Sequence, residues 1–117
     1  MNFRVEFYET EAGDSPVQEF LSQLTPKMHA KVVDMLKLLE EYGNALREPY
    51  SSSLEDGIFE LRCKVGSDIT RELYFFYVGR RIIVTNGFIK KTQKTPRAEI
   101  ILAKKRRADF IKREESR

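Results

Sequence analysis

The sequence predicts a single α+β domain whose helices pack against an antiparallel sheet. Three observations favour this fold. The 117 residues are enough for one hydrophobic core without disulfides or a structural metal, and too few for a second domain. Stretches with the 3.6-residue period of helices follow a first strand-like segment and return near the C-terminal end. Between them lie three segments rich in β-branched and aromatic residues, so the predicted order is β-α-α-β-β-β-α.

The first predicted elements are a strand and a pair of helices. Residues 3–7 alternate apolar and charged side chains, which is the period of a half-buried strand. A Ser-Pro pair at 15–16 and a Thr-Pro pair at 25–26 each combine an N-cap residue with proline in the first helical position. Gly43 stands where a left-handed C-cap glycine is expected. These signals predict a helical hairpin.

The middle of the chain is predicted to be a loop followed by a meander. Residues 43–57 show no period and contain a proline and three consecutive serines, so we expect a connecting loop there. The three strands that follow are expected at 58–64, 69–78 and 81–88. The turns between them are short, and the strands should therefore pair antiparallel with their neighbours.

A last helix is expected after a third Thr-Pro pair, at 95–96. This helix lies in the basic part of the chain. Residues 1–79 hold 8 Lys and Arg against 14 Asp and Glu, whereas residues 80–117 hold 13 against 4. Such a basic segment is typical of a polyanion-binding surface. The alternative is a solvated helix that merely carries many Lys and Arg side chains.

Several classes of protein are disfavoured. Cys63 is the only cysteine and His29 the only histidine, so we expect no intramolecular disulfide, no metal site and no cofactor. The N-terminus carries charges and lacks the apolar core of a signal peptide, and no uncharged run is long enough to span a membrane. These features predict a cytoplasmic protein without membrane contact.

Cations on the meander are the candidate chemical groups. Strand alternation places Glu60, Arg62 and Lys64 on one face, opposite a core face. Arg71 lies near the start of the next strand and the Lys pair 90–91 follows the last one, so the meander can gather these cations. They would grip phosphate and stabilise the charge that develops when a ribose 2′-OH attacks it, which points to RNA cleavage without a metal.

Two structural alternatives stand beside this interpretation. Arg62 and Arg71 can instead form ion pairs with Glu60 and Glu72 across the strands. The aromatic side chains of residues 73–77 are by default core residues. Phe88, at the end of the last strand and next to the lysines, is the aromatic residue best placed to stack on an RNA base.

Three motifs carry a family resemblance: GIFELR at 57–62, RELYFF at 71–76 and NGFIKKTQKTP at 86–96. With them, the chain resembles the RelE/ParE superfamily over nearly its whole length, and in particular the HigB-like branch, which includes phage-derived members. The resemblance implies one RelE-like domain over residues 1–117. It also implies the toxin of a type II toxin–antitoxin system, which cleaves mRNA in the ribosome and is held inactive by a helix-turn-helix, HigA-like antitoxin.

The resemblance also implies roles for individual residues. Arg62 and Arg71 match positions that orient and neutralise the scissile phosphate, and Lys90 or Lys91 matches a lysine that assists proton transfer. The further RNA contacts that we predict are Lys64, Phe88, Lys94 and Arg97.

The general base is left open by the sequence. Some ribonucleases of the family carry a tyrosine or histidine near the last helix or at the C-terminus, and this chain has neither after Tyr77. Lys90, Lys91, Tyr77 and Glu60 remain candidates, each needing a pKa near neutrality. Two other functions also remain: a ParE-like inhibitor of DNA gyrase, and a nucleic-acid-binding protein that cleaves nothing.

Overall fold

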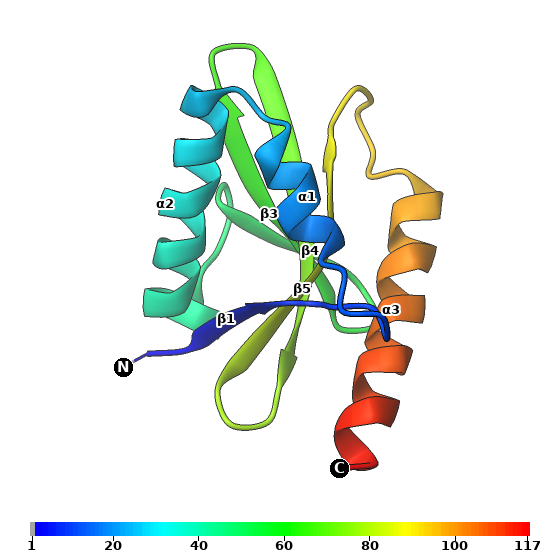
Figure 1. The fold of residues 1–117 in the computed structure, drawn as a ribbon. Coiled ribbons are helices and arrows are strands. Elements are labelled where there is room, and N and C mark those ends of the chain that lie inside the picture. Colours follow the sequence, from blue (N-terminus) through cyan, green and yellow to red (C-terminus); the bar gives the residue numbers. More distant parts are fainter. Residues whose placement is uncertain (1) are drawn as a thin grey trace.

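The computed structural model describes residues 2–117 and contains one five-stranded sheet with three α-helices (Figure 1). Helices α1 and α2 cover one face of the sheet, called here the α1–α2 face, and α3 packs on the other, the α3 face. The elements are β1 (Arg4–Phe7), α1 (Pro16–Ser22), α2 (Pro26–Tyr42), η1 (Gly43–Ala45), β2 (Ser51–Glu55), β3 (Ile58–Val65), β4 (Asp68–Tyr77), β5 (Arg81–Ile89) and α3 (Arg97–Glu115).

The strand order in the sheet is β1-β5-β4-β3-β2. Strands β2 to β5 pair antiparallel, and the predicted meander is confirmed in β3, β4 and β5. The β1 edge differs from the prediction, because β1 runs parallel to β5 with Arg4 opposite Arg81. The connection from β1 to β5 includes α1, α2 and strands β2 to β4, which is far longer than the crossover that a parallel pair requires.

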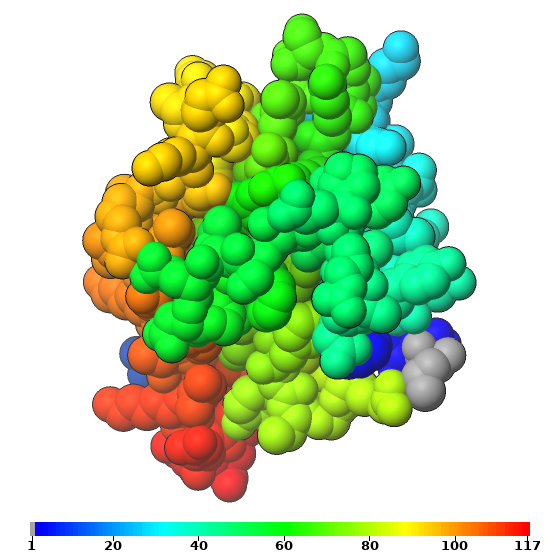
Figure 2. Space-filling view, turned by 180° about the vertical axis from the view of Figure 1, so that it is seen from behind, coloured from blue at the N-terminus to red at the C-terminus, as the bar shows by residue number. Residues whose placement is uncertain are grey.

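The prediction of a loop over residues 43–57 was wrong. A short 3₁₀ helix and the strand β2 lie there, and β2 pairs with β3 along the edge of the sheet. Ser51 is buried, and its hydroxyl lies 2.6 Å from that of Tyr74. Seen from behind, the green β2 lies between the orange and red α3 and the blue-green segment after α2 (Figure 2).

The first two predicted helix starts are confirmed. Ser15 Oγ accepts a hydrogen bond from the backbone N–H of Gln18, and Thr25 Oγ1 accepts one from that of Met28. Gly43 ends α2 with a φ of +53°, as expected for its C-cap position. None of the helices within residues 2–117 is long and apolar enough to cross a membrane.

The third cap prediction was wrong. Pro96, not Thr95, is the N-cap residue of α3, and no side chain caps this helix end. The Thr95 hydroxyl instead donates a hydrogen bond to Glu60 Oε1 on β3. This contact ties the segment before α3 to the sheet.

The α1–α2 face is closed by apolar packing. Leu21, Val32 and Leu39 from the helices meet Leu61 and Tyr74 from the sheet, and all five are nearly inaccessible. The helical stripe of α2 thus packs as its 3.6-residue period predicted.

The α3 face has a second, smaller core. Leu73, Phe75 and Ile83 of the sheet pack against Ala103 of α3, with Ile58 beside them. Helix α3 covers these positions, and the ends of β3 and β4 nearest their connecting turn extend beyond this cluster. The polar residues described next lie on that extension.

Candidate nucleic-acid interface

Three predicted site residues form a row across the sheet. Arg62 on β3 lies directly opposite Arg71 on β4, and Arg71 lies opposite Phe88 on β5. Directly opposed residues of antiparallel strands project from the same face, so the meander brings these side chains together as predicted. Phe88 is half-buried at the border of the α3 core.

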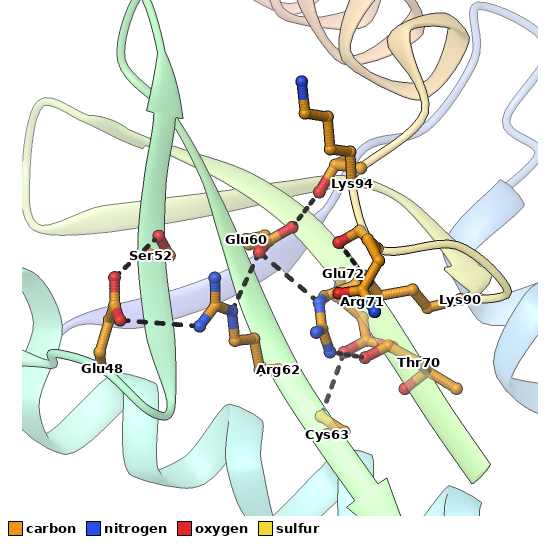
Figure 3. A network of polar contacts seen from close by, with 12 residues as sticks. Glu48, Ser52, Glu60, Arg62, Cys63, Thr70, Arg71, Glu72, Lys90 and Lys94 are labelled. Atoms are coloured by element: carbon orange, nitrogen blue, oxygen red, sulfur yellow. Dashed lines mark hydrogen bonds and ion pairs between the residues drawn. The ribbon is translucent and has the colours of Figure 1, made fainter.

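Glu60 joins the two arginines (Figure 3). Its Oε2 accepts a hydrogen bond from Arg62 Nε at 3.0 Å and lies 3.5 Å from Arg71 Nε. The Glu60 side chain is 3% exposed. Like charges directly opposite each other destabilise a sheet, and this buried carboxylate offsets that repulsion. The Arg62 guanidinium also approaches the exposed Glu48, at 3.8 Å.

Arg71 is the more deeply placed of the two arginines, with 12% of its side chain exposed against 32% for Arg62. Burial lowers the pKa of Arg71, and the negative charge of Glu60 opposes that effect. One of its terminal nitrogens donates to the Thr70 carbonyl, while Nε has no hydrogen-bond partner among residues 2–117. Arg71 is thus held by charge more than by a complete set of hydrogen bonds.

The alternative in which Arg71 pairs with Glu72 is wrong. Glu72 points to the α1–α2 side, where Cys63 donates a hydrogen bond to its Oε1 at 3.2 Å. The second carboxylate oxygen has no partner within the described residues. Burial raises the pKa of Glu72 to about 7, and it also raises the pKa of the Cys63 thiol, with the nearby Glu72 as a second cause. The pairing with Glu60, in contrast, is present for both arginines.

The segment between β5 and α3 carries three of the predicted lysines. Lys90 is half-buried, and its ammonium donates hydrogen bonds to the carbonyls of Gln93 and Thr92 in the same segment. Lys91 and Lys94 are exposed. The segment and the β3–β4 turn project at the same end of the molecule (Figures 1 and 2), and the Lys90 N–H donates to Ile69 O of β4.

Lys64 belongs to this same end of the sheet. It lies opposite Ile69 next to the β3–β4 turn, and its side chain is exposed. The strand register places Lys64 two residues beyond Arg62 on the same face. The lysines therefore lie at the same end of the sheet as the arginine row.

Arg97 is not part of this group. Both of its terminal nitrogens bind the Glu55 carboxylate at the β2–β3 turn, and Lys104 binds the same group. Hydrogen bonds from Arg97 and Lys104 lower the pKa of Glu55 to about 2. Arg107 likewise binds Asp56. Part of the basic charge of α3 is thus used to fasten the helix to the β2–β3 turn.

The other aromatic residues of β4 are packed in the two cores, as their default interpretation predicted. Tyr74 stacks on Phe59 with 5.6 Å between the ring centroids. Tyr77, a candidate general base, packs edge-on against Phe110 of α3 at 5.3 Å. Tyr77 is six positions after Arg71 along β4, about 20 Å in an extended strand. Tyr77 is therefore outside the arginine cluster.

Two features of the site were not foreseen from the sequence. Glu60 was considered as a base and as a partner of Arg62, but not as a group shared by both arginines and Thr95. Its position two residues before Arg62 was the available signal, because residues two apart share a strand face. The Thr95-Pro96 pair fits the sequence pattern of a helix N-cap. Nothing in the sequence indicated that the Thr95 hydroxyl contacts the sheet instead.

The geometry defines what this site can do. Two guanidinium groups lie side by side on the sheet with a half-exposed aromatic ring next to them, and exposed lysines lie at the same end of the sheet. Arginine donors fit the oxygens of phosphate esters, and an aromatic ring can stack on an unpaired base. Among residues 2–117, no three His, Cys, Asp or Glu side chains gather as potential metal ligands.

Comparison with known proteins agrees with this fold. The chain is similar to a chain in the crystal structure of the archaeal RelE–RelB complex from Pyrococcus horikoshii OT3. The match has 19% sequence identity and a TM-score of 0.54, and it covers 81% of this chain and 100% of that chain. The predicted RelE-like α+β fold is confirmed. No curated protein sequence matches the chain.

A family model then places the chain more narrowly. Residues 19–108 match the family described as "Phage derived protein Gp49-like (DUF891)". This match covers well over half of the 117 residues. The chain belongs to this Gp49-like family of phage-derived proteins.

Proposed function

We propose that the protein is the toxin of a type II toxin–antitoxin system and acts in the cytoplasm as an endoribonuclease on ribosome-bound mRNA. The observation that carries the proposal is the Arg62–Arg71 pair, held on the α3 face next to Phe88. The RelE-like fold and the Gp49-like family support it. We place the protein in the HigB-like branch on its GIFELR and NGFIKKTQKTP motifs.

The arginines are the electrostatic part of the proposed mechanism. When a ribose 2′-OH attacks the adjacent phosphate, negative charge grows on the phosphate oxygens. Arg62 and Arg71 would orient that phosphate and stabilise the charge, without a metal ion. Fixed donors of this kind are effective because they do not need to reorganise during the reaction.

The surrounding residues would hold the RNA. Phe88 would stack on a base next to the scissile phosphate, and Lys64, Lys91 and Lys94 would contact neighbouring phosphates. Lys90 already donates to two carbonyls and has one ammonium N–H left for a phosphate. Arg97 would contribute only if it were released from Glu55.

A second candidate function is RNA binding without cleavage. One observation favours it: none of three candidate bases is free next to the arginines. Both Glu60 oxygens are engaged, Lys90 is bound to carbonyls and Tyr77 packs against α3. Lys91 is exposed and remains available as a base.

We further propose a small helix-turn-helix antitoxin of the HigA type as the partner. One solved structure with a similar fold is that of a RelE–RelB complex, in which such a protein is paired with another. An antitoxin that covers the arginine row would block mRNA directly.

The test is induced expression in a bacterial host, followed by primer extension on cellular mRNA. The wild type is compared with the variant Arg62→Ala/Arg71→Ala and with Lys105→Ala, which changes an exposed cation of α3 outside the site. Codon-phased cuts with the wild type and Lys105→Ala, absent from the double variant, are the expected result.

Other outcomes point elsewhere. Growth arrest without mRNA cuts would contradict the ribonuclease and favour a ParE-like gyrase inhibitor, which a DNA supercoiling assay would then detect. RNA binding without arrest or cuts would favour the second candidate. Binding should weaken steeply with salt in that case, because phosphate contacts release counterions.

A further inference from the structure

We propose that Glu60 is a positioning residue that couples the two arginines to the lysine-bearing segment before α3, and that it is not the general base. The inference rests on the proposed function for its effect on RNA. The positioning of the arginines is supported by three contacts of the Glu60 carboxylate, with Arg62, Arg71 and Thr95.

The Glu60 carboxylate is shielded from solvent. Glu60 is 2% exposed, although it lies on the charged part of the sheet. Arg62 and Thr95 take one oxygen each. Arg71 approaches the oxygen that binds Arg62 (Figure 3). A base must reach the 2′-OH within hydrogen-bonding distance. Glu60 lies beneath the groups that would contact the phosphate and has no free oxygen for that role.

The negative charge of Glu60 balances the two arginines of the cross-strand pair. Arg62 and Arg71 are directly opposed, and Arg71 is mostly buried. Without Glu60 the two guanidinium groups would repel each other, and Arg71 would lose its neutralising partner. Glu60 therefore fixes the spacing and the outward direction of the donors that meet RNA.

Thr95 links Glu60 to the segment before α3. Its hydroxyl donates to the Glu60 oxygen that the arginines do not use. Thr95 follows the lysine-bearing residues 90–94, whose other anchor is the bond from Lys90 N–H to Ile69 O. One carboxylate thus sets both the arginine row and the end of the segment that carries the lysines, so a change at Thr95 should be felt at the arginines.

The variants for the test are Glu60→Gln, Glu60→Ala, Thr95→Val and Thr95→Ser. Glutamine keeps the shape of the side chain: its oxygen can accept from the arginines, and its NH₂ can donate to the Thr95 hydroxyl. Serine keeps the hydroxyl of Thr95, and valine removes it. If Glu60→Ala fails to fold, the other three variants still carry the test.

The first readout needs no substrate. The Nε–H signals of Arg62 and Arg71 are followed by NMR in the full chain. We expect the Arg62 signal to shift in Glu60→Gln and Thr95→Val and to stay in place in Thr95→Ser. Arginine signals that stay in place in Glu60→Gln and in Thr95→Val would overturn the proposal.

The second readout uses a single-stranded RNA oligonucleotide, with binding and single-turnover cleavage measured against pH. If Glu60 is a positioning residue, Glu60→Gln should lower the cleavage rate by no more than about tenfold and keep its pH profile. Removal of a general base would lower the rate about 100-fold or more. A loss of that size with normal RNA binding would overturn the proposal. If the wild type binds RNA but cuts none, the ribonuclease fails, and the positioning role is decided by binding and by the arginine signals.

Discussion

Two buried glutamates on neighbouring strands show how differently the two faces of the sheet treat the same chemical group. Glu60 on the α3 face has two arginines and a hydroxyl as partners. Glu72 on the α1–α2 face accepts a hydrogen bond from the Cys63 thiol, and one of its oxygens has no partner among residues 2–117. The same residue type therefore supports a cationic surface on one side and is an isolated acid within apolar packing on the other.

The difference shows that position on the sheet, more than residue type, decides what a charge does. On the α3 face the negative charge holds two arginines side by side. On the α1–α2 face the same charge is costly, because burial disfavours the ionised form. Experiments at the two sites should separate an effect on RNA from an effect on stability.

The largest effect is expected for Arg71→Ala on the α3 face. Loss of a fixed cation at the scissile phosphate should reduce RNA cleavage about 100-fold or more, and growth arrest with it, while the far-ultraviolet circular dichroism stays that of a folded protein. Cleavage assays and growth curves would measure this, with Lys105→Ala as control. A folded Arg71→Ala variant that arrests growth at the wild-type level would contradict the site.

The next effect is expected for Glu72→Gln on the α1–α2 face. The pKa of Glu72 is about 7 when folded and near 4.5 when unfolded, so the folded state binds the proton more tightly. Stability should fall as pH rises from 4.5 through 7, by about 3 kcal/mol in the wild type. Glutamine removes this penalty.

Urea denaturation at pH 4 and pH 8.5 would measure the effect of Glu72→Gln. The variant should match the wild type at the lower pH and be the more stable protein at the higher one. The control is Glu115→Gln, in which the changed carboxylate is exposed. Equal pH dependence in wild type and Glu72→Gln would show that Glu72 is ionised in the folded protein.

A smaller effect is expected for Phe88→Leu, a substitution on the α3 face. Stacking of one base on an aromatic ring contributes about 1–3 kcal/mol, so RNA binding should weaken about tenfold. Phe88→Tyr keeps the ring and should bind within a few-fold of the wild type. Fluorescence anisotropy with a single-stranded oligonucleotide would compare them, and equal affinity of the leucine variant would remove Phe88 from the interface.

The smallest effect is expected for Glu55→Gln at the β2–β3 turn. It frees Arg97 and Lys104 from their shared carboxylate and makes them available to phosphate. RNA binding should become slightly tighter, and its dependence on salt steeper by about one to two phosphate contacts. Affinities measured between low and moderate salt would show this, with Glu11→Gln as control. An unchanged salt slope would mean that the two cations do not reach the RNA.

Much of the fold was predictable because its signals are local. The cap pairs before α1 and α2 and the meander strands each depend on residues next to one another in sequence. Strand β2 was missed because three of its five residues are serine and it has no alternating apolar pattern. These residues form a strand because they pair with β3 and because Ser51 contacts Tyr74 in the interior.

The candidate site was predictable in part for a similar reason. Strand alternation placed Arg62 on the charged face, and the meander brought Arg71 and Phe88 next to it. The direction of Glu72 follows from the same rule, because neighbouring residues of a strand point to opposite faces. Arg97 could not be assigned from sequence, since its partner Glu55 is distant in the chain and belongs to the missed strand.

The parallel pairing of β1 with β5 also bears on how the protein is made. Arg4 finds its neighbour Arg81 only after most of the chain has left the ribosome, because β5 is the strand on which β1 rests. Contacts so far apart in sequence form late and slow the folding of small domains. We therefore expect the first strand to be synthesised to be among the last to be placed, and the nascent chain to stay without its completed sheet until translation is nearly finished.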